Sequence, residues 1–170
     1  IVLLVGSANY EDGMTNGAVA RELNLANAAV VETLPGQASS TGPMALADID
    51  GDGQLDLFVG GRVMAGRWPE AASSLVFRGV GDKFVPDVEN TKRLAGVGLV
   101  SGAVFSDLTG DGLPELVLAL EWGPLRVFRN DHGRLDPWDV PLSSLNSQPS
   151  TLNSLPGSWN FSKGMPSRTG

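Results

Sequence analysis

The strongest chemical signal in the sequence is a short segment rich in carboxylates. Its pattern, Asp-x-Asp-x-Asp-Gly-x-x-Asp, places acidic side chains at positions 1, 3, 5 and 9, which are Asp48, Asp50, Asp52 and Asp56. Carboxylates this close repel one another, so we expect the loop to fold well only around a compensating cation. The main-chain carbonyl at position 7, from Gln54, would point at the same centre. Oxygen ligands in this number are typical of calcium, and the segment therefore predicts a calcium site.

A second segment, 59 residues further along the chain, repeats the pattern with one change. Its ligands would be Asp107, Thr109, Asp111, the main-chain carbonyl of Leu113, and Glu115. Thr109 supplies a neutral hydroxyl at position 3, where the first segment has a carboxylate. Because calcium affinity rises with the charge of the ligand set, we expect weaker binding at the second segment.

Two other interpretations of these segments remain open. An EF-hand needs a bidentate carboxylate at position 12 and helices on both sides. Position 12 is Val59 in the first segment and Leu118 in the second, and the flanking sequence is typical of strands. The segments could also be ordinary Asp/Gly hairpin turns with solvated charges. Two aligned copies favour calcium binding over both alternatives.

The acidic segments belong to a longer internal repeat. Each is followed by the sequence Val-Phe-Arg, at residues 76–78 and 127–129. Since this second offset is 51 residues, the first copy contains eight extra residues around 62–73. Residues 2–6 resemble residues 56–60, so the chain begins inside an earlier copy whose acidic loop is missing.

Each copy is predicted to form a small antiparallel sheet. The apolar runs are short, rich in Val, Leu and Phe, and bounded by Gly, Asp, Asn or Pro, which is typical of strands. In the middle copy the strands are predicted near residues 44–49, 55–60, 74–79 and 83–86. No apolar stripe demands a helix, although residues 17–29 could be helical on propensity alone. Four strands per copy are typical of a β-propeller blade, which needs a neighbour on each side.

The motif at residues 47–61, followed by a Val-Phe-Arg hairpin, resembles the FG-GAP/VCBS repeat of integrin-α-type β-propellers. Residues 60–69 are similar to bacterial proteins that pair such propellers with an ASPIC/UnbV domain, and to the cartilage acidic protein group. The resemblance implies a ring of about six to eight blades, calcium bound between the first two strands of each blade, and a role in adhesion or ligand display. This chain departs from the pattern because it is too short to close a ring, has Thr109 in its second loop and lacks a third loop.

The expected fold class is therefore all-β, with about two complete propeller blades, part of a third and no closed ring. Residues 1–139 would form this partial propeller, with a partial blade at 1–43 and blades at 44–102 and 103–139. Residues 140–170 contain no Asp or Glu and carry a tandem polar heptad, which predicts a linker or a degenerate tail.

Composition narrows the classes of partner. Twelve basic and nineteen acidic side chains give a net charge of −7, which argues against nucleic acid or an anionic membrane surface. The absence of cysteine excludes disulfides and thiolate chemistry. No apolar run is long enough to span a membrane. The chain opens on Ile1 rather than Met, and we expect it to be a piece of a longer protein.

Candidate catalytic groups are few, and we predict no enzymatic activity. His132 is the only histidine and falls in an Asn-Asp-His-Gly turn, where we expect it to be solvated. No nucleophile elbow, phosphate-binding loop or zinc-protease motif is present. The four tryptophans could stack on sugars and two arginines could hold an anion, but packing between blades for the tryptophans and surface solubility for the arginines are the favoured explanations. These residues are Trp68, Trp122, Trp138, Trp159, Arg62 and Arg67.

The sequence thus predicts a calcium-binding repeat module of a larger secreted, cell-surface or periplasmic protein, acting in adhesion or in binding a protein or carbohydrate ligand. The alternative is the partial propeller of a calcium-dependent polysaccharide lyase or hydrolase whose catalytic groups lie elsewhere. In either case the remainder of the parent propeller would be a partner. An incomplete ring leaves apolar surface on its end blades uncovered, so we expect the isolated chain to associate.

Overall fold

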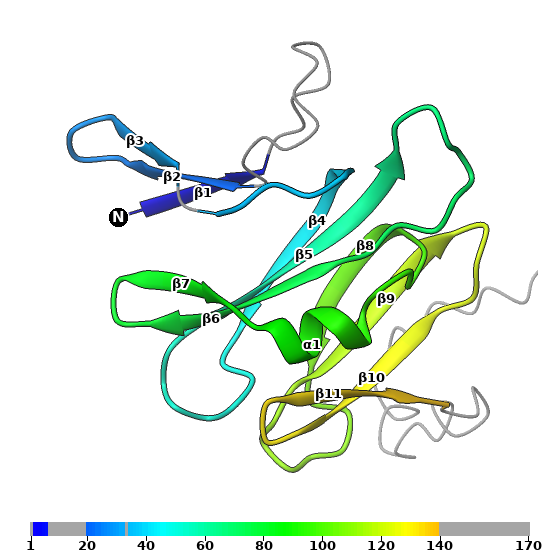
Figure 1. Cartoon of the computed structure of the whole chain (residues 1–170). Helices are drawn as coiled ribbons and strands as arrows, with labels where there is room; N and C mark the ends of the chain where they lie inside the picture. Colours follow the sequence, from blue (N-terminus) through cyan, green and yellow to red (C-terminus); the bar gives the residue numbers. More distant parts are fainter. Residues whose placement is uncertain (1, 7–19, 33, 140–170) are drawn as a thin grey trace, which may run out of the picture. The chain divides into compact units, whose positions relative to one another are not determined.

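Three antiparallel sheets, one for each copy of the repeat, make up the described part of the chain (Figure 1). The computed structural model describes residues 2–6, 20–32 and 34–139. The first sheet contains β1 (Val2–Gly6), β2 (Ala20–Asn24) and β3 (Ala29–Glu32). The middle sheet contains β4 (Ser39–Ala47), β5 (Asp56–Met64), β6 (Leu75–Val80) and β7 (Lys83–Pro86). The third sheet contains β8 (Leu99–Ser106), β9 (Glu115–Glu121), β10 (Arg126–Asp131) and β11 (Arg134–Trp138).

The predicted all-β class is confirmed, and the sheets do not close into a ring. In every sheet, strands that follow one another in the sequence are also neighbours in space, so each sheet is a simple meander. The helical alternative for residues 17–29 is wrong for its described part, because residues 20–24 and 29–32 are strands. The predicted linker or tail at residues 140–170 lies outside the described residues.

The first strand of the middle sheet starts earlier than the sequence predicts. β4 begins at Ser39 rather than near residue 44. Its pairing with β5 shifts register twice between Ser39 and Met44, and Gly42 and Pro43 lie inside the shifted segment. A Cβ on Gly42 would lie 3.0 Å from the carbonyl oxygen of Gly60. Glycine and proline normally indicate a break in a strand, so the sequence suggests a loop where the structure has a bulged strand.

The central strand β5 is covered on both of its faces. Phe58 belongs to a core cluster shared by the middle and third sheets, together with Ile49, Val76, Leu94, Val100, Leu116, Leu118, Phe128 and Leu135. Leu57 and Val59, which alternate with Phe58 along the strand, belong to a second cluster shared with Ala20, Leu34 and Phe77. A sheet that is apolar on both faces requires a neighbour on each side, which explains how the three sheets stack.

One short helix, α1 (Val88–Arg93), was not expected from the sequence. The side chain of Asp87 caps its first turn by accepting a hydrogen bond from the backbone N–H of Asn90, at 2.9 Å. The Asn90 side chain is buried, and it donates to the carbonyl of Gly133 (2.7 Å) and accepts from the N–H of Leu135 (2.9 Å) in the third sheet. Six residues are too few to show an apolar stripe, and tertiary contacts of this kind stabilise the helix instead.

Large apolar side chains are exposed on the outer sheets and also on the middle sheet, where Leu46, Val80 and Val85 are each more than two-fifths exposed. Leu3, Val5 and Val30 of the first sheet and Val104 of the third are each more than two-fifths exposed. Association of the chain through these surfaces stays a prediction. Among the described residues there is no helix with the length and apolarity that a bilayer crossing requires.

Candidate metal sites in the acidic loops

The two acidic segments form equivalent loops. Residues 48–55 connect β4 to β5, residues 107–114 connect β8 to β9, and both loops lie at the lower end of the strands in Figure 1. Strands flank both loops, so the EF-hand alternative is wrong. The left-handed backbone is also shared, with φ of 79° at Gly51 and 78° at Gly110. Glycine is the residue that adopts this conformation without steric cost, which explains the Gly in both motifs.

The carboxylate at position 1 organises each loop through backbone amides. Asp48 accepts hydrogen bonds from the N–H groups of Gly51 (2.8 Å), Asp52 (3.1 Å) and Gly53 (2.8 Å). Asp107 accepts from the two corresponding glycine amides, at 2.7 and 2.9 Å. These amides offset part of the negative charge of each loop.

The carboxylate at position 9 is buried at the base of each loop, where it accepts hydrogen bonds from backbone N–H groups. Asp56 is 2% exposed, and its two oxygens accept from the N–H groups of Ile49 (3.0 Å) and Gly79 (2.9 Å). Burial raises the pKa of the Asp56 carboxyl, although these two amides act in the opposite direction. In the second loop, the fully buried Glu115 accepts from the N–H of Leu108 at 2.7 Å through Oε2. Its other oxygen, Oε1, is buried without a hydrogen-bond partner.

Three of the predicted ligands in the first loop come together. One carboxylate oxygen from each of Asp48, Asp50 and Asp56 lies within 4.8 Å of the others, so this cluster could hold a metal ion. Asp52 is not part of this cluster, and its oxygens accept from the backbone N–H (2.8 Å) and the side-chain amide (3.1 Å) of Gln54.

The described residues of the second loop form no corresponding group of three acidic ligands. Asp111 accepts from the N–H of Leu113 at 2.9 Å, the contact that Asp52 makes in the first loop. This bond and a second one with the side chain of Thr109 lower the pKa of the Asp111 carboxyl. Asp107, Asp111 and Glu115 are therefore each held by amides rather than gathered around one point.

The main residue that sequence reasoning missed at this site is Arg78. One of its terminal nitrogens lies 2.8 Å from Oδ2 of Asp50 and 3.6 Å from Oδ2 of Asp56, two of the three clustered carboxylates. Its Nε also pairs with Asp87 at 2.7 Å. The available signal was the Val-Phe-Arg sequence, whose arginine recurs at the same place in the middle and third copies. In the third sheet the equivalent Arg129 is exposed and lies 5.9 Å from the ring centroid of Trp138.

Asp87 gives a pH dependence that can be tested. Burial raises the pKa of this carboxyl, but the N–H of Asn90 and the guanidinium of Arg78 outweigh burial, so the pKa lies below the ordinary value of 3.8. A lowered folded-state pKa stabilises the fold above about pH 3.8, and this contribution is lost as the pH falls through the folded value. We expect the difference in the free energy of unfolding between the wild type and Asp87→Asn, measured by urea unfolding, to become smaller as the pH falls from 5 to 3. A gap that stays constant over this range would contradict the assignment.

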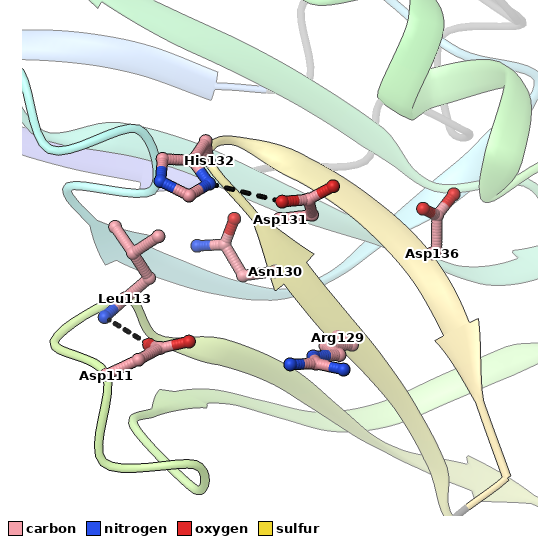
Figure 2. A pocket seen from close by; sticks show the side chains of 7 residues that line it. All are labelled: Asp111, Leu113, Arg129, Asn130, Asp131, His132 and Asp136. Atoms are coloured by element: carbon pink, nitrogen blue, oxygen red, sulfur yellow. Dashed lines mark hydrogen bonds and ion pairs between the residues drawn. The ribbon is translucent and has the colours of Figure 1, made fainter.

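A polar cavity of about 380 Å³ opens beside the second loop (Figure 2). Its lining consists of Asp111, Leu113, Arg129, Asn130, Asp131, His132 and Asp136. Figure 2 shows the loop residues Asp111 and Leu113 facing the turn that carries His132. The His132 side chain is largely exposed and its Nδ1 lies 3.1 Å from the Asp131 carboxylate, in keeping with the predicted solvated turn. None of the lining residues is a hydroxyl or thiol nucleophile.

The side chain of Asn130 forms hydrogen bonds to both acidic loops. Its side-chain amide donates to the carbonyl of Ile49 in the first loop (2.8 Å) and to that of Pro114 in the second (3.1 Å). Its Oδ1 accepts from the N–H of Gly133 at 2.8 Å. Asn130 is 2% exposed, so these bonds form away from water. Sequence reasoning missed this residue because its partners lie up to 81 residues away.

The chain matches no protein-family model, no curated protein and no solved structure. The resemblance of its acidic motif to the FG-GAP/VCBS repeat therefore remains an interpretation of the motif.

Proposed function

We propose that this chain is a calcium-binding repeat module of the FG-GAP/VCBS type, from a larger secreted or surface protein in which it takes part in adhesion or ligand binding. The observation that carries the proposal is the cluster of Asp48, Asp50 and Asp56, whose ligand oxygens lie within 4.8 Å of one another. The meander sheets, stacked through cores on both faces of β5, are compatible with propeller blades.

Calcium is the cation that this ligand set suits best. Every side-chain donor in the first loop is a carboxylate or an amide, and residues 48–56 contain neither histidine nor cysteine. Zinc and copper favour nitrogen and sulfur ligands, whereas calcium accepts six to eight oxygens in flexible geometry. Asp50 and residues 51–53 are exposed, so water can complete the coordination.

The buried Oε1 of Glu115 supports a cation at the second loop as well. A buried carboxylate oxygen without a partner is costly, and a bound cation would satisfy it. Thr109 leaves this loop with three charged ligands instead of four, so the proposed order of affinity is the first loop followed by the second.

A calcium ion at either loop would stabilise the hairpin that contains it. Positions 1 and 3 belong to the loop, whereas position 9 is the first residue of the next strand, β5 or β9. A cation bound by all three would hold the loop to the strand. Because the unfolded chain does not gather these ligands, the binding free energy would add to the stability of the fold.

Asp52→Asn and Asp111→Asn form a matched pair of tests. Each wild-type carboxylate accepts from the N–H two residues later, and asparagine can keep that bond, so the variants differ from the wild type mainly in charge. For the wild type we expect a dissociation constant of about 10⁻⁴–10⁻³ M, and about 2.7 kcal/mol of added stability per site at ~100 times that concentration. Position 5 is expected to turn from Gln54 toward a bound ion, and on that basis Asp52→Asn should abolish most of the gain at the first loop. Asp111→Asn should remove less in total.

Isothermal titration calorimetry and calcium-dependent thermal unfolding measure both effects. Magnesium serves as the control cation, because it demands near-octahedral geometry and should bind more weakly. If calcium releases no heat and leaves the melting temperature unchanged, the calcium assignment fails. If both variants lose the same amount, only the order of affinity fails.

A further inference from the structure

Two exposed tryptophans meet at the end of the sheets opposite the acidic loops. Trp68 lies in the β5–β6 loop, within the extra residues that distinguish the middle copy from the next, and Trp122 directly follows β9. These loops lie at the upper end of the strands in Figure 1. The two rings are edge to face, with centroids 6.3 Å apart and planes at 76°.

Folding alone does not account for Trp122. Its side chain is 82% exposed, so it contributes little of the burial that makes tryptophan stabilising. Its backbone is also left-handed, with φ of 60°, a conformation that costs free energy for any residue with a Cβ. The edge contact with Trp68 joins two loops, but Trp68 is itself 56% exposed. A strained and exposed aromatic residue is more readily explained by ligand binding than by packing.

The charges beside the two tryptophans cancel. Arg62 forms an ion pair with Glu121, the residue before Trp122, and Arg67 forms one with Glu70 at 3.2 Å. Both pairs are partly exposed, so their remaining hydrogen-bonding groups are accessible. Because each arginine already has a carboxylate partner, the surface offers no net charge to an anionic or a cationic ligand.

We propose that Trp68 and Trp122, with the Arg62–Glu121 and Arg67–Glu70 pairs beside them, form a binding site for a neutral carbohydrate. The apolar face of a sugar ring packs on an indole face, and the guanidinium and carboxylate groups pair with its hydroxyls. This proposal specifies the ligand class for the ligand-binding role proposed above, and it rests on that role. It does not require calcium, since the acidic loops lie at the other end of the strands.

The test is a titration of the full chain with a panel of neutral hexasaccharides built on glucose, xylose, mannose, galactose or N-acetylglucosamine. Tryptophan fluorescence and calorimetry report binding. We expect at least one sugar to bind, and Trp122→Ala and Trp68→Ala each to weaken its binding by at least about tenfold, as truncation of a central aromatic anchor does. Trp122→Phe keeps an aromatic face and should recover part of the affinity. Val80→Ala removes a 57% exposed apolar side chain beside the β6–β7 turn and should leave binding unchanged.

Each titration is repeated in EDTA to separate this proposal from calcium binding. Equal affinity with and without calcium supports an independent site, and a failure of calcium binding leaves the sugar result intact. The proposal is overturned if no sugar of the panel binds, or if both alanine variants bind the sugar as tightly as the wild type. A sulfated polysaccharide and a proline-rich peptide are titrated in parallel, and the proposal is also overturned if the alanine variants weaken binding of only these two ligands.

Discussion

Asn130→Ala is expected to lower the free energy of unfolding by about 3–5 kcal/mol. The change removes both donors and the acceptor of a 2% exposed side chain, and so leaves the carbonyls of Ile49 and Pro114 and the N–H of Gly133 without their partner. Each buried polar group left unpaired costs about 1–3 kcal/mol, and the lost bonds include the link to the first acidic loop. Urea unfolding at neutral pH measures the loss.

Asp131→Ala is the control for this change, because Asp131 is the next residue and its side chain is 71% exposed. Surface changes of this kind usually stay within about 0.5 kcal/mol. Asn130→Asp gives a second comparison. It keeps the oxygen that accepts from the N–H of Gly133, but it replaces the donating amide nitrogen with an oxygen that repels the carbonyls of Ile49 and Pro114. It should be nearly as destabilising as alanine. A loss for Asn130→Ala no larger than that for Asp131→Ala would show that this asparagine does not join the loops.

Arg78→Gln should have opposite effects on the stability of the calcium-free chain and on calcium affinity. Without calcium, Asp50, Asp56 and Asp87 lose their shared counter-charge. Breaking a buried pair costs about 3–5 kcal/mol, and we expect about 3 kcal/mol because Arg78 is 23% exposed. With calcium, the first loop should bind more tightly by on the order of tenfold, because the Arg78 guanidinium no longer competes with the ion for Asp50 and Asp56.

Arg129→Gln provides a matched control from the next copy of the repeat. Arg129 is exposed and lies over Trp138, so its loss should cost less than about 1 kcal/mol. Denaturant unfolding in EDTA and calorimetric titration with calcium give the two readouts. If Arg78→Gln binds calcium no more tightly than the wild type, this arginine does not compete for the clustered carboxylates. Equal destabilisation by the two variants would mean that the buried ion pairs contribute nothing specific.

The sequence by itself determined the local parts of this structure. The alternation of short apolar runs with Gly, Asp, Asn and Pro predicted the strands of the middle sheet, and β5, β6 and β7 begin within one residue of their expected positions. The acidic motifs predicted two equivalent loops, and left-handed glycines recur at matching positions in both. These features depend on residues close in the chain, whose hydrogen bonds and steric limits follow from residue type and spacing.

The contacts between sheets were decided only by the tertiary structure. The same Val-Phe-Arg sequence places Arg78 against the first acidic loop and Arg129 over an indole ring, because different neighbours surround each arginine. The partners of Asn130 lie up to 81 residues away, and the side chains of Trp68 and Trp122 come together from separate sheets. Spacing along the chain predicts which side chains share a loop or a strand face. Which of them meet across two stacked sheets depends on how the cores pack, and packing is a property of the whole fold.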